Sequence, residues 1–370
     1  MNRIFAQFKR HIVNRLLLAE VYFYRAIRRA FFIKKRVKLV AIAKNEGAYL
    51  TEWIHHHLYF KFDSIDVYIN NTEDDTNLLI SKLAKLKNVK FLDGDKYFHL
   101  GVDAPQIAIY KKAFLEARRR LYSHVVFLDV DEFWSSSDFH SSIKDSLSEI
   151  DADIVAYEWV NKLEDDQLFS FPFQVSMKGK RALQIKVAVS TSVFIRDMNP
   201  HNVTSGNYSY VLANGETFDR TCSNHSKVDK SELSLPLKKY YILHRINRSQ
   251  EEYIASLSRG RPLSLKKVTS CFKSNRSGFG VGLTNVDITI APNKLSDYKN
   301  SLEEFISEYG LDTVINSCQR FIIDTFGNTL DNIRQADEKE KYVLEKVLRG
   351  IDRKEVLDSY KVFKEGHEEN

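Results

Sequence analysis

Short apolar segments alternate with segments of helical period between residues 37 and 130, and this alternation constrains the fold more than any other feature of the chain. Four runs are short and rich in β-branched and aromatic residues, as in buried strands: Val37–Ala43, Ile65–Ile69, Val89–Leu92 and Val125–Val130. Helical periodicity separates them over Tyr49–Phe60, Leu78–Leu86 and Ile107–Leu121. Strands that alternate with helices of this length form βαβ units. The sequence therefore predicts an α/β fold with a mostly parallel sheet flanked by helices.

Polar residues follow three of these predicted strands at the point where each strand ends. Because the carboxyl ends of parallel strands meet at one edge of a sheet, these positions should form one crevice, where open α/β sheets bind their ligands. The residues concerned are Lys44, Asn45 and Glu46 after the first strand, Asn70 and Asn71 after the second, and Asp129 and Asp131 after the fourth.

The fourth strand end carries the densest group of carboxylates. Asp129, Asp131 and Glu132 follow the apolar run directly. On a continuing strand Asp129 and Asp131 point the same way, and two like charges so close need a cation, a shared proton or water. A divalent cation that also binds substrate phosphates would supply the positive charge. A turn with solvated carboxylates is the alternative that this pattern leaves open.

Basic residues are concentrated at the start of the chain. The formal net charge is +6, but residues 1–36 contain ten Lys and Arg residues and a single acidic residue, Glu20. The rest of the chain has 45 basic and 48 acidic residues, so its body lacks the basic excess that nucleic-acid binding needs. Apolar residues are interleaved with the basic ones, without a run long enough to span a membrane. Residues 1–36 therefore predict a basic amphipathic helix, either in peripheral contact with an anionic membrane or packed on the protein itself.

The cysteines and the chain start point to a reducing compartment. Cys222, Cys271 and Cys318 are far apart and odd in number, which is typical of neither a disulfide framework nor a zinc site. No secretory signal is recognisable in the first residues. We therefore expect a cytoplasmic protein, held on the inner face of the cell membrane if its first segment binds lipid.

The second half of the chain changes character. Strand-like runs occur at Ile154–Trp159, Ile185–Ile195 and Tyr240–Leu243, the last of them closed by His244, and residues 199–230 read as loops. Helical period returns in Glu252–Ser258 and continues over residues 297–364. Three parts are therefore predicted: a basic segment over residues 1–36, a catalytic domain over 37–295 and a helical region over 296–370.

Several short motifs occur together in one order. They are Lys44-Asn45-Glu46, Glu52-Trp53, Asn70-Asn71-Thr72-Glu73-Asp74, Asp129-Val130-Asp131-Glu132-Phe133, and His244 followed by Ser249, Glu251, Glu252 and Tyr253. This series resembles the glycosyltransferases of the family 2-like and family 92-like groups over about residues 37–262. The chain departs from the usual pattern at Lys61, where a Gly is common, and at Arg245, where a Tyr is common.

The resemblance implies a GT-A (Rossmann-like) fold, a nucleotide-sugar donor (a UDP-sugar foremost) and Mn²⁺ or Mg²⁺. By the same resemblance Asp131 holds the metal, Asp129 contacts the ribose or shares the metal, and His244 is a last metal ligand or a diphosphate contact. The other donor contacts that it implies are Lys44, Asn45, Glu46, Asn70 and Asn71 around the nucleotide, Lys186 facing the phosphates, and Arg259 at the diphosphate or an anionic acceptor. A glycan or a lipid-linked molecule would accept the sugar, as in the synthesis of bacterial surface polysaccharide.

An inverting transfer needs a carboxylate that takes a proton from the acceptor hydroxyl. Asp165 and Asp219 are open candidates, but Glu132 and Glu158 are favoured because they lie near predicted strand ends.

Two other classes of protein remain in view. A phosphatase of the haloacid-dehalogenase type also places an Asp-x-Asp pair, here Asp129 and Asp131, after an apolar strand. That motif prefers Thr or Val where this chain has Phe133. A non-catalytic carbohydrate-binding protein would have no need for paired carboxylates beside polar strand ends.

Overall fold

The computed structural model describes residues 19, 22, 23, 26, 35–99, 104–163, 167–206, 208–218, 226–258, 270–280 and 282–368. The strands are β1 (Val37–Ala43), β2 (Ser64–Ile69), β3 (Val89–Asp93), β4 (His124–Phe127), β5 (Glu132–Ser136), β6 (Ile154–Lys162), β7 (Ser176–Ser190), β8 (Ile195–Met198), β9 (Val203–Ser205), β10 (Tyr210–Leu212), β11 (Tyr240–His244) and β12 (Thr284–Thr289). The α-helices are α2 (Gly47–Tyr59), α3 (Thr76–Leu83), α4 (Asp95–His99), α5 (Pro105–Arg119), α6 (Ile143–Ile150), α7 (Gln250–Ser258), α8 (Pro292–Tyr309), α9 (Asp312–Arg334), α10 (Lys341–Val347) and α11 (Lys354–Glu368). Two short 3-10 helices are η1 (Lys230–Ser234) and η2 (Glu338–Glu340).

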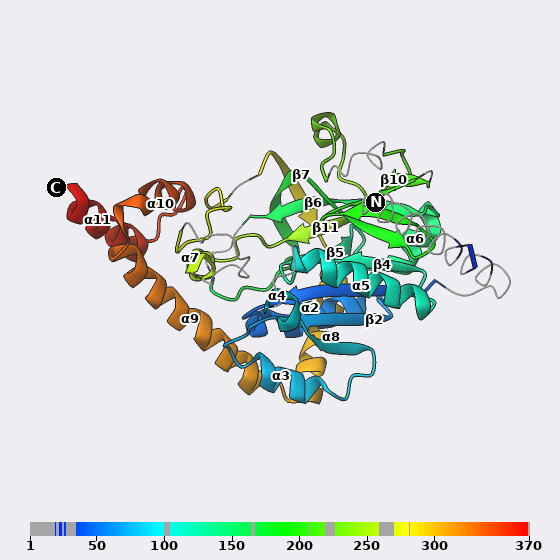
Figure 1. Cartoon of the computed structure of the whole chain (residues 1–370), viewed down its shortest axis with the longest axis horizontal. Coiled ribbons are helices and arrows are strands. Elements are labelled where there is room, and N and C mark those ends of the chain that lie inside the picture. Colours follow the sequence, from blue (N-terminus) through cyan, green and yellow to red (C-terminus); the bar gives the residue numbers. More distant parts are fainter. Residues whose placement is uncertain are drawn as a thin grey trace, which may run out of the picture.

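One large sheet organises the molecule (Figure 1). Its strands follow the order β3-β2-β1-β4-β7-β6-β11-β5, with β10 beside β6 and β12 beside β7. Pairs β3-β2, β2-β1, β1-β4, β6-β11 and β10-β6 are parallel, whereas β7 and β5 run against their neighbours. The predicted α/β class, a mostly parallel Rossmann-like sheet flanked by helices, is confirmed.

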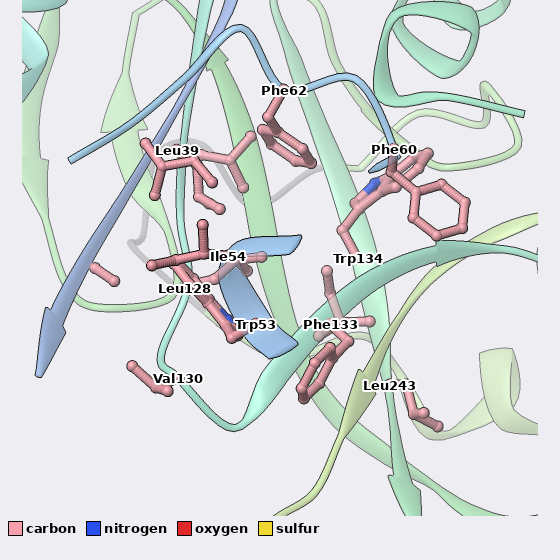
Figure 2. Packing of buried hydrophobic residues seen from close by; sticks show 14 of the residues in the cluster. Leu39, Trp53, Ile54, Phe60, Phe62, Leu128, Val130, Phe133, Trp134 and Leu243 are labelled. Carbon is pink, nitrogen blue, oxygen red and sulfur yellow. The ribbon is translucent and has the colours of Figure 1, made fainter. Parts of the chain in front are cut away.

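Helices cover both faces of the sheet because its central strands are apolar on both sides. On β1, Leu39 belongs to the buried cluster that contains Trp53 and Ile54 of α2. Val40, the next residue, belongs to the opposite cluster with Tyr110 of α5. Figure 2 shows Trp53 and Ile54 among Leu128, Val130 and Phe133, so α2 packs directly beneath the carboxylate-rich segment.

Three consecutive histidines on α2 belong to this packing. His57 Nδ1 lies 2.8 Å from the carbonyl oxygen of Trp53, and His56 Nε2 lies 2.7 Å from that of Trp134. Burial lowers the pKa of His57 to about 3 and that of His55 to about 4. The side chains are therefore neutral packing groups in the core beneath the sheet.

The predicted strand Val125–Val130 ends earlier in the structure than its sequence indicates, and this changes the site. β4 ends at Phe127 instead of continuing to Val130, and β5 begins at Glu132. The Glu132 amide donates to the Asp129 carbonyl at 3.0 Å and closes a turn between the two strands. Asp129 and Asp131 therefore lie in a turn, and the expectation that they sit on one continuing strand is wrong.

The second half of the chain contains more sheet than its sequence predicts. β7 begins at Ser176, well before the predicted start, and ends at Ser190, because pairing with β12 adds a polar extension that apolar patterning does not reveal. Residues 199–230, predicted as loops, contain β9 and β10. The proposed boundary between residues 295 and 296 falls inside α8.

The C-terminal helices pack on the sheet domain. α9 contacts α2, α3 and α7, and it carries α11 at its far end (Figure 1). None of the described helices is long and apolar enough to span a membrane. The amphipathic helix predicted within residues 1–36 lies almost wholly outside the described residues.

Candidate functional site

A cavity of about 880 Å³ lies over the carboxyl ends of the parallel strands. It gathers side chains that are distant in sequence, as the polar strand ends predict. Lys44 and Glu46 reach it from β1, Asn70 from β2, Asp129 and Asp131 from the turn after β4, and His244 from β11. Further lining residues are Trp159 and Asn161 of β6, together with Lys227, Lys273, Asn275 and Arg276.

Backbone contacts fix the carboxylate-bearing turn beneath this cavity. The Trp53 indole donates from Nε1 to the Glu132 carbonyl at 2.9 Å, which ties the turn to α2. The Arg245 amide donates to the Asp131 carbonyl at 2.8 Å, which ties it to the end of β11. Local sequence and tertiary packing together therefore hold the two aspartates at the carboxyl-end edge of the sheet.

Asp129 shares a buried cation with Glu132. Lys186 Nζ lies 3.1 Å from Asp129 Oδ2 and 3.0 Å from Glu132 Oε2, and the lysine side chain is fully buried. Burial lowers the pKa of Lys186, but the two carboxylates outweigh that effect and raise it. Burial also raises the pKa of Glu132, whose Oε2 accepts the Asp129 amide at 2.9 Å. Lys186 thus neutralises the charge of Asp129 and Glu132 from the protein interior, and it does not line the cavity.

Asp131 faces His244. Asp131 Oδ2 and His244 Nε2 are 3.6 Å apart, and His244 Nδ1 lies 3.1 Å from Asn161 Oδ1. Because an amide oxygen only accepts, Nδ1 donates the hydrogen, and in the neutral ring Nε2 keeps a free lone pair toward Asp131. Burial raises the pKa of Asp131, but His244, Arg248 and Arg276 outweigh it, and the net direction is downward.

This pair has the chemistry of an incomplete metal site. A carboxylate oxygen and an imidazole nitrogen, the latter oriented by a second residue, suit Mn²⁺ or a similar ion. Within the described ranges no three His, Cys, Asp or Glu side chains are grouped so that they could hold a metal ion. An ion at Asp131 and His244 would therefore take further ligands from a bound substrate, as Mg²⁺ does with phosphates.

Several predicted contacts lie away from the cavity. Asn45 lines a second cavity of about 270 Å³ against α7 and α9, and its Oδ1 accepts the Glu73 amide at 2.7 Å. Asn71 is exposed outside the main cavity. Arg259, Asp165 and Asp219 lie outside the described residues.

Glu158 does not fit the role of catalytic base. It is fully buried, pairs with Arg181, and lies 2.6 Å from Lys238 Nζ. It is absent from the cavity lining, so it cannot accept a proton from a molecule bound there. Glu132 is likewise fully buried beneath the turn, where its contacts with Lys186 and the Asp129 amide position Asp129. Neither of the two residues predicted as a base lines the cavity, and the assignment of a catalytic base stays a prediction.

Three contributors to the site were not singled out from the sequence. Trp159 packs against His244, with ring centroids 4.1 Å apart. Asn161 could have been found as a fourth polar strand end, because it follows the predicted strand that begins at Ile154. Arg276 lies in a loop without apolar period, and no local signal marks it.

Comparisons with known proteins give no family. No protein-family model matches the chain, and no curated protein matches it. Among solved structures, TarS residues 1–349 from S. aureus is similar at 12% identity over 82% of this chain and 92% of that chain, with a TM-score of 0.28. The same protein in complex with UDP matches at 12% identity over 90% and 92%, with a TM-score of 0.26. HddC from Yersinia pseudotuberculosis matches at 11% identity over 50% and 94%, with a TM-score of 0.28. Similarity this low assigns neither family nor ligand.

Proposed function

We propose that this protein is a metal-dependent glycosyltransferase of the hexosyltransferase type. It would move a sugar from a nucleotide-sugar, a UDP-sugar foremost, to a glycan or a lipid-linked acceptor in surface polysaccharide synthesis. The observation that carries the proposal is that Asp131 and an oriented His244 line one cavity together with Lys44, Asn70 and the cations Lys227, Lys273 and Arg276. Its volume of about 880 Å³ is in the range of sites that enclose cofactor-sized ligands.

The lining chemistry supports a ligand that is negatively charged at one end and polar at the other. Lys44 and Asn70 lie at the ends of β1 and β2, where they would contact the nucleotide together with Glu46. Asp129 is compensated by Lys186 and its side chain is 41% exposed, so it can accept from a ribose hydroxyl. These roles make the β1-β2-β4 end of the cavity the nucleotide half.

A divalent cation would supply Lewis-acid charge to the departing diphosphate. Asp131 and His244 would hold it, and Asn161 would fix the imidazole by accepting from Nδ1. The indole of Trp159 borders His244 and limits the access of water to this side of the site.

The acceptor and the membrane contact remain parts of the same proposal. Ten basic residues within 1–36 would attract an anionic membrane surface, which would bring the enzyme to a lipid-linked acceptor. Removal of residues 1–33 should then abolish sedimentation with anionic vesicles while leaving nucleotide binding unchanged. Unaltered sedimentation would end the membrane part alone.

Calorimetry with UDP, GDP and CDP, with and without Mn²⁺, tests the central claim. We expect UDP to bind with the highest affinity, and only weakly when the metal is absent. A wild-type protein that binds no nucleoside diphosphate with any metal contradicts the proposal. Tight binding without sugar release from any UDP-sugar would instead favour the non-catalytic binding protein.

A further inference from the structure

Of the two cations expected at the diphosphate, Lys186 does not line the cavity. Lys186 is buried and occupied by Asp129 and Glu132, and Arg259 lies outside the described residues. The cationic side chains that line the cavity are Lys44, Lys227, Lys273 and Arg276. The last two come from one segment, residues 270–280, which also contributes Asn275, Ser277 and Gly278 to the lining.

Arg276 is the best placed of these for an anion near the candidate metal. It is partly buried, and it lines the same cavity as Asp131 and His244. Among the described residues no carboxylate lies within ion-pair distance of its guanidinium. A guanidinium that is partly withdrawn from water and unpaired is suited to bidentate binding of phosphate oxygens.

The C-terminal helical region holds this segment in place through polar contacts. The Phe279 amide donates to the carbonyl of Arg349, two residues after the end of α10, at 2.8 Å. Lys346 of α10 donates from Nζ to the Ser274 carbonyl at 3.0 Å. Ser270 Oγ donates to Glu340 Oε2 at 2.5 Å. Three points along the segment are thus fixed by residues 340–349.

Two glycines allow the close approach of these backbones. Gly278 has φ +112°, and a Cβ there would lie 2.6 Å from the Arg349 carbonyl oxygen. Gly350 has φ +81°, and a Cβ there would lie 2.9 Å from the Phe279 carbonyl oxygen. Both positions favour glycine by conformation as well as by space.

Apolar packing supports the same junction. Phe272 is buried in a cluster with Leu344 and Val347 of α10 and Tyr253 of α7. The Tyr253 hydroxyl also donates to the Val347 carbonyl at 2.8 Å. The segment that carries Arg276 is therefore seated on the C-terminal helices on one side and borders the cavity on the other.

We propose that Arg276 binds the diphosphate of the donor and that the C-terminal helical region serves to position it there. The proposal rests on the function proposed above. It gives the helices beyond residue 295 a defined part in ligand binding, and it assigns the diphosphate cation to a residue outside the motifs of the sheet domain.

Calorimetry on the full chain with Mn²⁺ and three probes, inorganic pyrophosphate, UDP and uridine, tests the role of Arg276. We expect Arg276→Gln to weaken pyrophosphate and UDP at least tenfold and to leave uridine unchanged, and Arg276→Lys to recover part of the loss. Equal pyrophosphate affinity in wild type and Arg276→Gln overturns the inference. Arg276-dependent binding of pyrophosphate without binding of UDP would end the proposed nucleotide-sugar function and leave Arg276 as a pyrophosphate-binding residue only. Binding of none of the probes would end both.

A matched pair of glycine variants tests positioning. Gly350→Ala should displace the Phe279 carbonyl and weaken pyrophosphate severalfold with uridine unchanged. Gly327→Ala in α9, where a Cβ meets nothing within 4 Å, should change neither affinity. Lys346→Met serves as a second variant that keeps the backbone intact, and it should act in the same direction as Gly350→Ala. If Gly350→Ala and Lys346→Met both retain wild-type pyrophosphate affinity, the helices do not position Arg276.

Discussion

Two groups of carboxylates, one around the buried Glu158 and one at the partly exposed turn after β4, differ in how completely their charges are matched. Glu158 has a cation at each oxygen, Arg181 and Lys238, and both cations are themselves nearly inaccessible to solvent. Around the turn after β4, and counting only side chains that the structure describes, Lys186 is the one cation paired with Asp129 and Glu132, and Asp131 faces His244 at 3.6 Å. The first group is closed within the protein. The second has capacity left for a cation or a proton from outside, which is what a binding site needs.

The buried histidines show the same contrast. Both ring nitrogens of His56 have partners, Trp134 and Tyr298, and His57 contacts backbone atoms of Trp53 and Trp134. In His244, Nδ1 is hydrogen-bonded to Asn161, and Nε2 faces Asp131 at the cavity surface. His56 and His57 are thus paired within the protein at both ring nitrogens, whereas His244 keeps Nε2 directed at Asp131. The following variants are designed to separate these two kinds of residue.

The largest expected effect is on stability, from Glu158→Ala. This change leaves Arg181 and Lys238 buried without their shared carboxylate, and breaking a buried pair in this way costs about 3–5 kcal/mol. Urea unfolding measures the loss, and UDP affinity of the folded protein should stay unchanged because Glu158 does not line the cavity.

Glu149→Ala is the matched control for that variant. Glu149 pairs with Lys239 at 3.0 Å on the surface, where both side chains are about half exposed, and such pairs contribute about 0–1 kcal/mol. Equal destabilisation by the two variants would show that the Glu158 group is not the closed structural cluster described here.

Asp131→Asn should lower ligand affinity and leave stability nearly unchanged, the reverse of Glu158→Ala. The amide keeps the shape but removes the charge that a divalent ion needs, so Mn²⁺-dependent UDP affinity should fall about 100-fold, equivalent to about 3 kcal/mol. Stability should change by about 1 kcal/mol or less because the side chain is only partly buried. Calorimetry with and without Mn²⁺ checks this, and a variant that keeps full metal dependence would place the ion elsewhere.

A pH comparison tests the buried histidines. Burial holds the pKa of His57 at about 3, below the value of about 6.5 in an unfolded chain. The unfolded state therefore binds more protons below pH 6.5, and the stability present above that pH is lost as the pH falls. Between pH 7 and pH 5 the loss is about 2 kcal/mol for this one group.

His57→Gln should remove that part of the pH dependence, whatever it does to stability at pH 7. The quantity to compare is the difference in unfolding free energy between the two pH values. His140→Gln, a substitution at an exposed histidine, should leave the difference as it is in wild type. An unchanged difference in His57→Gln would mean that this ring is protonated or hydrated in the folded protein.

The features that could be predicted from sequence are those that local pattern determines. The alternation of strands and helices up to residue 127 follows from apolar period. The meeting of Lys44, Asn70 and Asp131 follows from parallel strand direction alone. Neither the order of the elements nor the meeting of the strand ends depends on which strands are neighbours in the sheet.

The features that could not be predicted depend on pairing between distant segments. β7 enters between β4 and β6 and runs against both, and this places Lys186 beneath Asp129. Asn161 meets His244 because β6 and β11 pair in one particular register, 83 residues apart in the chain. Arg276 reaches the cavity because α10 fixes its segment. Tertiary packing decides each of these placements, and no local period records it.

The smallest effect on ligand affinity is expected at Asn161, which would act on the proposed ion indirectly, by orienting His244. Asn161→Ala removes the acceptor for Nδ1 and lets the ring turn or change tautomer, and loss of such a partner lowers metal affinity by about tenfold or more. Asn161→Asp keeps an acceptor at the same place and should retain the affinity of wild type for UDP with Mn²⁺. The apparent affinity for Mn²⁺ at saturating UDP separates the two variants, whereas unfolding free energies should not. If both variants bind Mn²⁺ as wild type does, His244 is a closed structural residue like His56, and the contrast between the two groups of histidines fails at this position.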